Sequence, residues 1–261
     1  MSANNRSVRI NGLKIGLKKI TALTNEQRYV YYLLGHMFNE LMCMQKLVAY
    51  ALPKHDDRRP FRRLAELSQA LLLFRLSTAK IYEAKIILDT QVVQAVLEAD
   101  VFPFLEFGRR SYVHLTTLIE GSNWLSSIRN RSAFHYPKYS QWSDYVRPTS
   151  SWVDDSIFIG EQSGNTFYEA SEAIARHWMF SQIERKDGET EAEVIDRLIE
   201  NMISLLKSAT NFLEEAMGTF VMRRLVDDER PTIAGKVSGP DFERVAIPFW
   251  THMARSKQET T

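Results

Sequence analysis

Cysteine is almost absent from this sequence, and that absence is the first constraint on where the protein works. Cys43 is the single cysteine of the 261-residue chain, so no disulfide can form within one copy. Disulfide frameworks are typical of small secreted domains, whereas reducing compartments keep thiols free. The first twenty residues also lack the apolar core of a secretory signal. We therefore expect the protein to be cytoplasmic.

Long apolar runs and chain-breaking residues are also scarce. Apolar runs such as ALLLF at 70–74 are far shorter than the roughly 18 residues of a membrane-spanning helix, so we expect no membrane partner. Only 11 glycines and 8 prolines interrupt the chain, and long stretches without them favour helices. Apolar residues make up 44% of the chain, which is typical of a folded protein with a substantial core.

Sequence signatures of several enzyme classes are missing. The glycine-rich loops G-x-x-x-x-G-K and G-x-G-x-x-G do not occur, which argues against a P-loop ATPase or a Rossmann oxidoreductase. The serine elbow G-x-S-x-G of α/β-hydrolases is absent as well. No Glu-x-x-His pair is present for a helical di-iron site, and we expect no metal and no cofactor. The net charge of +1 does not by itself indicate a nucleic-acid partner.

What the sequence does contain is helical periodicity. A capping box begins at Thr24, with Gln27 three residues later, and apolar residues then recur at helical spacing until Pro53. Similar patterns predict helices over 25–52, 61–97, 104–119, 123–136, 167–185 and 190–226. The pattern at 61–97 would span about 50 Å as one helix, so we expect a bend or break within it. The predicted fold class is all-α, a bundle of five or six helices.

Changes in composition divide the chain into segments. Residues 1–22 have basic and no acidic side chains, and we interpret them as a basic, partly extended N-terminal arm. Residues 23–226 form the helical domain, with a polar, irregular insert at 137–166 that is long enough to be functional. Residues 227–261 contain three prolines and are expected to be an irregular tail. Within this tail, VAIPFW at 245–250 is apolar enough to dock on another part of the protein.

One short segment, RNRSAFH at 129–135, combines residue types that suit phosphodiester cleavage. Histidine titrates near neutral pH and can act as base or acid, so His135 is a candidate catalytic residue. Arginine stays charged and binds phosphate through paired hydrogen bonds, which suits Arg129. Asn130 can orient either partner. Six residues place Arg129 and His135 about 120° apart around an α-helix, so joint action requires a distorted helix or a second copy of the chain.

The residues around this segment are basic and aromatic. Residues 121–150 contain four basic side chains against a single acidic one, and six aromatic side chains are interleaved with them. Such a mixture favours single-stranded nucleic acid, because cations attract the phosphates and aromatic rings stack on the bases. We therefore interpret RNA as the partner and the following residues as substrate-binding: Arg131, Tyr136, Lys138 and Trp142.

The segment RNRSAFH resembles the Arg-x(4–6)-His motif of the HEPN superfamily (higher eukaryotes and prokaryotes nucleotide-binding), in which a polar residue, often asparagine, follows the arginine. The resemblance implies a helical bundle and, in many members, a metal-independent ribonuclease of toxin–antitoxin or phage-defence systems that cleaves RNA by attack of the 2′-OH. It implies that Arg129 binds the scissile phosphate, His135 transfers protons and Asn130 supports both. It also implies a homodimer with two motifs in one site, and an antitoxin or other regulatory protein as a further partner.

Two other interpretations stay open at the level of the sequence. Arg129 and His135 could have a structural role, with the histidine packed between helices. The protein could also be a non-catalytic helical module that binds nucleic acid or a partner protein through residues 121–150. A ribonuclease requires His135 in a solvent-accessible cleft, whereas an interaction module predicts that His135 is buried or isolated.

Overall fold

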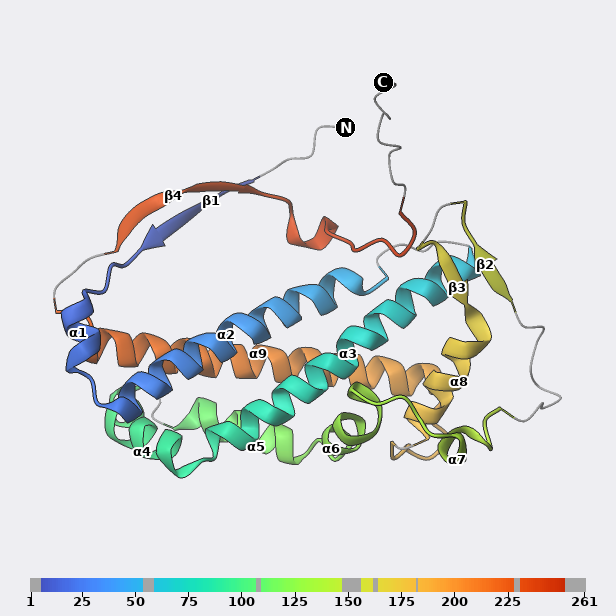
Figure 1. Cartoon of the computed structure of the whole chain (residues 1–261), viewed down its shortest axis with the longest axis horizontal. Helices are drawn as coiled ribbons and strands as arrows, with labels where there is room; N and C mark the ends of the chain where they lie inside the picture. The colour runs from blue at the N-terminus through green and yellow to red at the C-terminus, as the bar shows by residue number, and fades with distance from the viewer. Residues whose placement is uncertain are drawn as a thin grey trace, which may run out of the picture.

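The structure is a computed structural model of the chain, and it is predominantly helical (Figure 1). It describes residues 6–53, 59–106, 109–146, 156–161, 164–181, 183–227 and 231–251. The α-helices of these residues are α1 (Leu17–Ala22), α2 (Asn25–Ala51), α3 (Pro60–Leu88), α4 (Gln91–Asp100), α5 (Arg110–Glu120), α6 (Trp124–Ile128), α7 (Tyr139–Trp142), α8 (Glu169–Phe180) and α9 (Glu191–Arg224). Two antiparallel sheets pair β1 (Arg6–Gly12) with β4 (Thr232–Gly239) and β2 (Ile157–Ile159) with β3 (Thr166–Tyr168). None of these helices is both long and apolar enough to cross a membrane.

The predominantly helical fold expected from the sequence is confirmed, but the expected number of five or six helices is wrong. The described residues contain nine α-helices, partly because the predicted helix at 61–97 is divided into α3 and α4. The Thr90 hydroxyl donates to the Ile87 carbonyl oxygen at 2.8 Å, and the Gln94 amide donates to the Leu88 carbonyl oxygen at 2.7 Å. These bonds stabilise the break, since the last carbonyls of a helix have no partners within the helix.

The two long helices α2 and α9 start at capping boxes. The backbone N–H of Gln27 donates to the Thr24 hydroxyl at 3.2 Å, and the backbone N–H of Thr24 donates to the Gln27 side chain at 3.0 Å. Helix α9 begins with the same motif at Thr190. Glu189 directly precedes Thr190, and hydrogen bonds from Arg197 lower the pKa of the Glu189 carboxyl to about 2. The starting points of both helices are therefore encoded by neighbouring residues.

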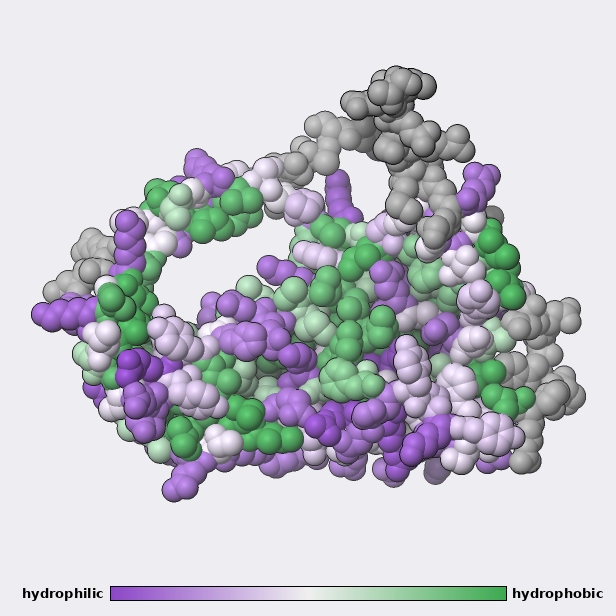
Figure 2. Space-filling view, in the orientation of Figure 1, coloured by the Kyte–Doolittle hydropathy of each residue, from purple (hydrophilic) through white to green (hydrophobic). Residues whose placement is uncertain are grey.

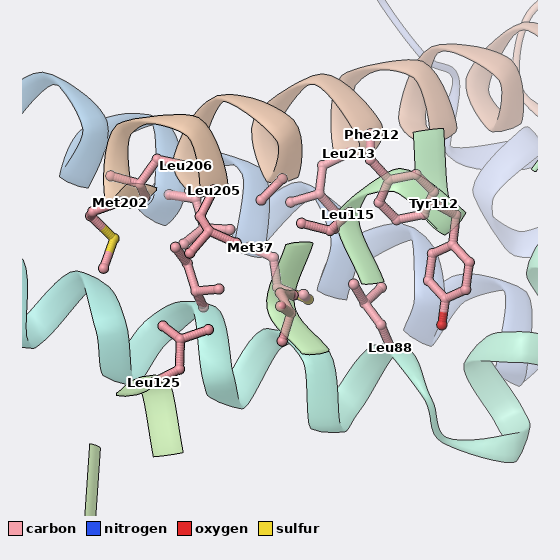
Figure 3. Packing of buried hydrophobic residues seen from close by; sticks show 14 of the residues in the cluster. Met37, Leu88, Tyr112, Leu115, Leu125, Met202, Leu205, Leu206, Phe212 and Leu213 are labelled. Atoms are coloured by element: carbon pink, nitrogen blue, oxygen red, sulfur yellow. The ribbon is translucent and has the colours of Figure 1, made fainter. Parts of the chain in front are cut away.

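The core lies where α9 crosses α2, α3 and α5 (Figure 1). Buried side chains recur along α9 every three or four residues, which is the spacing of one helix face; they include Val194, Leu198, Met202, Leu205, Ala209, Phe212, Ala216 and Phe220. Figure 3 shows members of this row meeting side chains from α2, α3, α5 and α6. The Phe212 ring is fully buried, with its centre 5.2 Å from that of Tyr112. Burying one such side chain contributes about 1.5–3 kcal/mol, so this row is a main source of stability.

The N-terminal arm and the C-terminal tail pair with each other. The sequence predicts an irregular tail, but residues 232–239 form β4, which runs antiparallel to β1 along its whole length. The resulting ribbon arches away from the helices in Figure 1, and Figure 2 shows an open gap beneath it. The prediction is wrong here because the partner strand lies at the other end of the chain, and strand formation depends strongly on such context.

The last described residues of the tail dock on α3 and β3 through aromatic side chains. Phe249 packs against Phe167 of β3, with ring centres 5.5 Å apart. Trp250 lies edge-on to Phe61 at the start of α3, with ring centres 5.9 Å apart. The apolar segment at 245–250 therefore brings the C-terminal part of the described chain against both the β2–β3 hairpin and α3.

The insert at 137–166 is only partly irregular. Its described residues include α7, β2 and the start of β3, whereas 147–155 and 162–163 lie outside the described residues. The Phe158 and Phe167 rings of the hairpin are stacked, with centres 6.4 Å apart. The prediction of an irregular insert is therefore wrong for these elements, because pairing and packing between strands order residues whose composition is polar.

Candidate functional site

The predicted site lies where a helix changes its hydrogen-bonding pattern. Helix α6 continues directly into a π-helical turn at Arg129–Ala133. The sequence predicts helix up to 136, but Pro137 disfavours helical geometry at Tyr136, and the chain leaves the helix before that point. Single turns of π-helix occur frequently at functional sites. The helix is thus distorted between Arg129 and His135, as joint action of these residues in one chain would require.

The guanidinium of Arg129 is held by two neighbours. Its Nε and Nη2 both donate to Oε1 of Glu83 on α3, with the Nε bond at 2.9 Å. Its Nη1 donates to Oδ1 of Asn130 at 2.8 Å, and its central carbon lies 5.9 Å from the ring centre of Tyr82. A guanidinium has five N–H groups, so one on Nη1 and one on Nη2 remain for a further acceptor. The side chain is 38% exposed, and paired donors of this kind suit a phosphate.

His135 lies beyond the π-helical turn, and its side chain is exposed. The exposure excludes a histidine packed between helices of one chain. Within the described residues, no hydrogen bond or ion pair joins the imidazole to another group, including Arg129. A single chain therefore gives His135 the solvent access that acid–base chemistry needs, but does not bond it to the arginine.

The four residues predicted to bind substrate have different environments. Arg131 is exposed in the middle of the π-helical turn, and Tyr136 is 98% exposed. Lys138 is also exposed and is the N-cap residue of α7. Trp142 is half-buried, and its indole N–H is buried without a hydrogen-bond acceptor among the described residues. The first three side chains are thus accessible to a ligand, whereas Trp142 packs against the protein.

Exposed aromatic rings are concentrated in the same short stretch. Phe134, Tyr136 and Tyr139 are 59%, 98% and 82% exposed, respectively. We name residues 131–139 the basic-aromatic segment, because they contain these three rings together with Arg131 and Lys138. Stacking on an aromatic side chain contributes about 1–3 kcal/mol per nucleic-acid base, so the segment is suited to binding an unpaired strand.

Sequence analysis does not identify two charged residues of α3 that lie close to the motif. Glu83 binds Arg129 from 46 positions away, and no local spacing signals that contact. Burial lowers the pKa of the Arg75 guanidinium, while the Glu172 carboxylate and, less strongly, the Tyr136 hydroxyl oppose this shift. Arg75 has one signal in the sequence, because it is a cation that directly follows the apolar run at 70–74.

The described residues contain no group of three or more His, Cys, Asp or Glu side chains that could hold a metal ion. His36 and Glu40 lie one turn apart on α2, with Nε2 and Oε2 separated by 3.6 Å. The Glu40 carboxylate also accepts a hydrogen bond from Lys80 at 2.8 Å. In the part of the chain that the structure describes, the acid–base candidate His135 therefore has no set of metal ligands beside it.

Comparison with known proteins identifies no relative of this chain. No model of a known protein family matches it, and no curated protein and no solved structure matches it. The resemblance to the HEPN superfamily therefore rests on the residues of RNRSAFH and on their helical setting.

Proposed function

We propose that the protein is a HEPN-like, metal-independent endoribonuclease that works as a homodimer. The observation that carries the proposal is the arrangement of the motif. Arg129 is fixed by Glu83 and Asn130 with two N–H donors left over, and His135 follows on a surface segment rich in exposed aromatic rings.

The proposed chemistry uses the nucleophile that RNA itself carries. His135 takes the proton of a 2′-OH or donates one to the departing 5′ oxygen, because an imidazole can do either near neutral pH. The two remaining donors of Arg129 bind the phosphate and stabilise the charge that grows on it in the transition state. The products would be a 2′,3′-cyclic phosphate and a 5′-OH.

A second copy of the chain would complete the site. Cleavage needs one group to accept a proton and another to donate one, whereas each chain contributes a single His135 beside Arg129. Two motifs facing each other across a two-fold axis supply both groups. An antitoxin or other regulatory protein that covers the basic-aromatic segment would block access of RNA to this site.

A second candidate function is a non-catalytic module that binds RNA or a partner protein. The observation that favours it is the ion pair between Glu83 and Arg129, which offsets the positive charge that a phosphate would meet. In this case the exposed rings of the basic-aromatic segment bind a ligand, and no bond in the ligand is broken.

Cleavage of RNA in the presence of EDTA tests the proposal. We expect the wild-type protein to cut members of a broad RNA panel and to leave 2′,3′-cyclic phosphate ends, detected by mass spectrometry. Once a cut is mapped, a single 2′-deoxy nucleotide on its 5′ side should abolish cutting there. Cutting that survives this replacement, or that stops in EDTA, contradicts the proposed mechanism. Binding of the panel without any product supports the non-catalytic module.

Glu83 is expected to act as a positioning residue for Arg129. Glu83→Ala should lower kcat for RNA cleavage by roughly 10²-fold, since small displacements of a catalytic group have effects of this size. Glu83→Gln should retain most of the activity, because an amide oxygen can still accept both hydrogen bonds. Single-turnover cleavage at saturating RNA measures the effect.

A matched control for Glu83→Ala is Glu40→Ala, which removes another partly exposed ion pair of α3, with Lys80. Each substitution should change the free energy of unfolding by about 1 kcal/mol or less, as is usual for exposed pairs. Equal activity of the two alanine variants would show that Glu83 does not position Arg129.

A further inference from the structure

Arg75 is a partly buried cation without an ion-pair partner among the described residues. It lies on α3, and its Nε is buried and makes no hydrogen bond. No described group forms an ion pair with its guanidinium. Six residues earlier on the same helix, the side-chain oxygen of Gln69 is also buried and accepts no hydrogen bond from the described residues. Ser77 Oγ, also on α3, is a third such atom. Buried polar groups are nearly always bonded in folded proteins, so an unbonded cation among them requires an explanation.

Other atoms of Arg75 and Gln69 line one pocket, which has a volume of about 420 Å³. Tyr168 of β3, Glu172 of α8 and Phe249 of the docked tail form other parts of its wall. The phenol ring of Tyr168 is largely exposed, whereas the tail places Phe249 against the hairpin. The pocket thus combines a cation, a hydrogen-bond acceptor and aromatic surface.

The electrostatics of the pocket favour an anion at Arg75. Burial lowers the pKa of its guanidinium, which shows that the charged form is poorly solvated. The Glu172 carboxylate interacts with this charge, but it does not approach closely enough to form an ion pair. A phosphate bound at this position would supply the missing acceptors and offset the cost of burying the charge.

The pocket is also close to the proposed catalytic motif. The hydroxyl of Tyr136, in the basic-aromatic segment, acts electrostatically to raise the pKa of Arg75, against the larger effect of burial. On α3, Tyr82 contacts Arg129 and lies seven residues after Arg75. Seven residues correspond to two helical turns and about 10 Å along the axis, so Tyr82 and Arg75 share one face of α3.

We infer that this pocket binds a nucleotide of the RNA substrate beside the scissile bond, with its phosphate on Arg75 and its base against Tyr168 and Phe249. This inference rests on the proposed function, because it places the scissile bond at Arg129 and His135. The strand would extend from the motif along α3 and past Tyr136.

Binding of an oligoribonucleotide that cannot be cleaved tests this inference. The probe is a fluorescent oligonucleotide with 2′-O-methyl groups, built on a sequence that the wild type cuts or, without cutting, binds. Arg75→Gln should weaken binding about tenfold or more, since the variant loses a charge-assisted hydrogen bond. Arg63→Gln, which changes an exposed arginine of the same helix, should leave the affinity unchanged.

The melting temperature separates a ligand-binding role from a structural one. Removal of an unpaired buried charge should leave the melting temperature unchanged or raise it. A clear fall in the melting temperature of Arg75→Gln, or unchanged affinity for the probe, would overturn the inference. Failure of the proposed function is distinguishable, because in that case the wild type cuts no RNA while the binding comparison still gives a result.

Free nucleotides provide the second arm of the test. A nucleoside monophosphate should compete with the oligonucleotide only weakly, and only in proteins that retain Arg75. A mononucleotide that binds tightly through Arg75 without displacing the oligonucleotide would overturn the assignment of the pocket to the RNA strand.

Discussion

Replacing His135 with alanine is expected to lower the rate of RNA cleavage by about 10²–10⁴-fold, the usual contribution of one acid–base residue. The side chain is exposed and makes no hydrogen bond or ion pair in the described chain, so its loss should not change the free energy of unfolding. Single-turnover cleavage in EDTA and thermal unfolding of the same preparations measure the two quantities.

A suitable control for this variant is His114→Ala, which removes an exposed histidine from α5. The control should cleave RNA as fast as the wild type. If His135→Ala and His114→Ala have equal rates, the assignment of His135 as a catalytic residue is wrong, whatever the wild type does to RNA.

Replacing Arg224 with alanine is expected to have the largest effect on stability, a loss of about 3 kcal/mol. Arg224 Nε donates to Oδ1 of Asp100 at 2.9 Å, and Asp100 is only 1% exposed. The Arg224 side chain itself is 43% exposed, but its removal leaves the Asp100 charge buried, and an uncompensated buried charge costs about 3–5 kcal/mol. The lower value applies here because Gln27 still donates to Oδ2 of Asp100 at 2.8 Å. Urea unfolding of both proteins measures the difference.

The control for Arg224→Ala is Lys19→Ala, since Lys19 pairs with Asp227 on the surface. Both groups of that pair are exposed, so its loss should cost about 1 kcal/mol or less. An effect of Arg224→Ala no larger than that of Lys19→Ala would show that Asp100 becomes hydrated without its cation.

These stability effects differ because Asp100 is buried, whereas both partners of the Lys19–Asp227 pair are exposed. Asp100 connects the end of α4 with the start of α2, through Gln27, and with the end of α9, through Arg224. No sequence pattern distinguishes this aspartate from the exposed ones, since its burial results from the packing of three helices. The sequence predicts the helices that meet here but not the ion pair between them.

In the candidate site, too, the sequence predicts the motif residues but not the contacts that hold them. The sequence identifies Arg129, Asn130 and His135 as a motif, and it predicts that the helix must be distorted if the residues act together within one chain. It does not identify Glu83, because the contact between Glu83 and Arg129 depends on how α3 packs beside the π-helical turn. It also does not reveal that Nε of Arg75 is buried without a hydrogen bond to any described residue, because this follows from what surrounds the side chain in the folded state.

The sequence by itself determined the helical character of the protein, the start of α2 at Thr24 and the position of the motif. A capping box joins residues three positions apart, and an apolar helix face is made of residues three or four positions apart. Both patterns are therefore visible in the linear chain. Only the tertiary structure decided that β1 pairs with β4, that Glu83 holds Arg129 and that Arg75 lines a pocket. These contacts join segments that are remote in sequence, and their free energy depends on the packing of the whole chain.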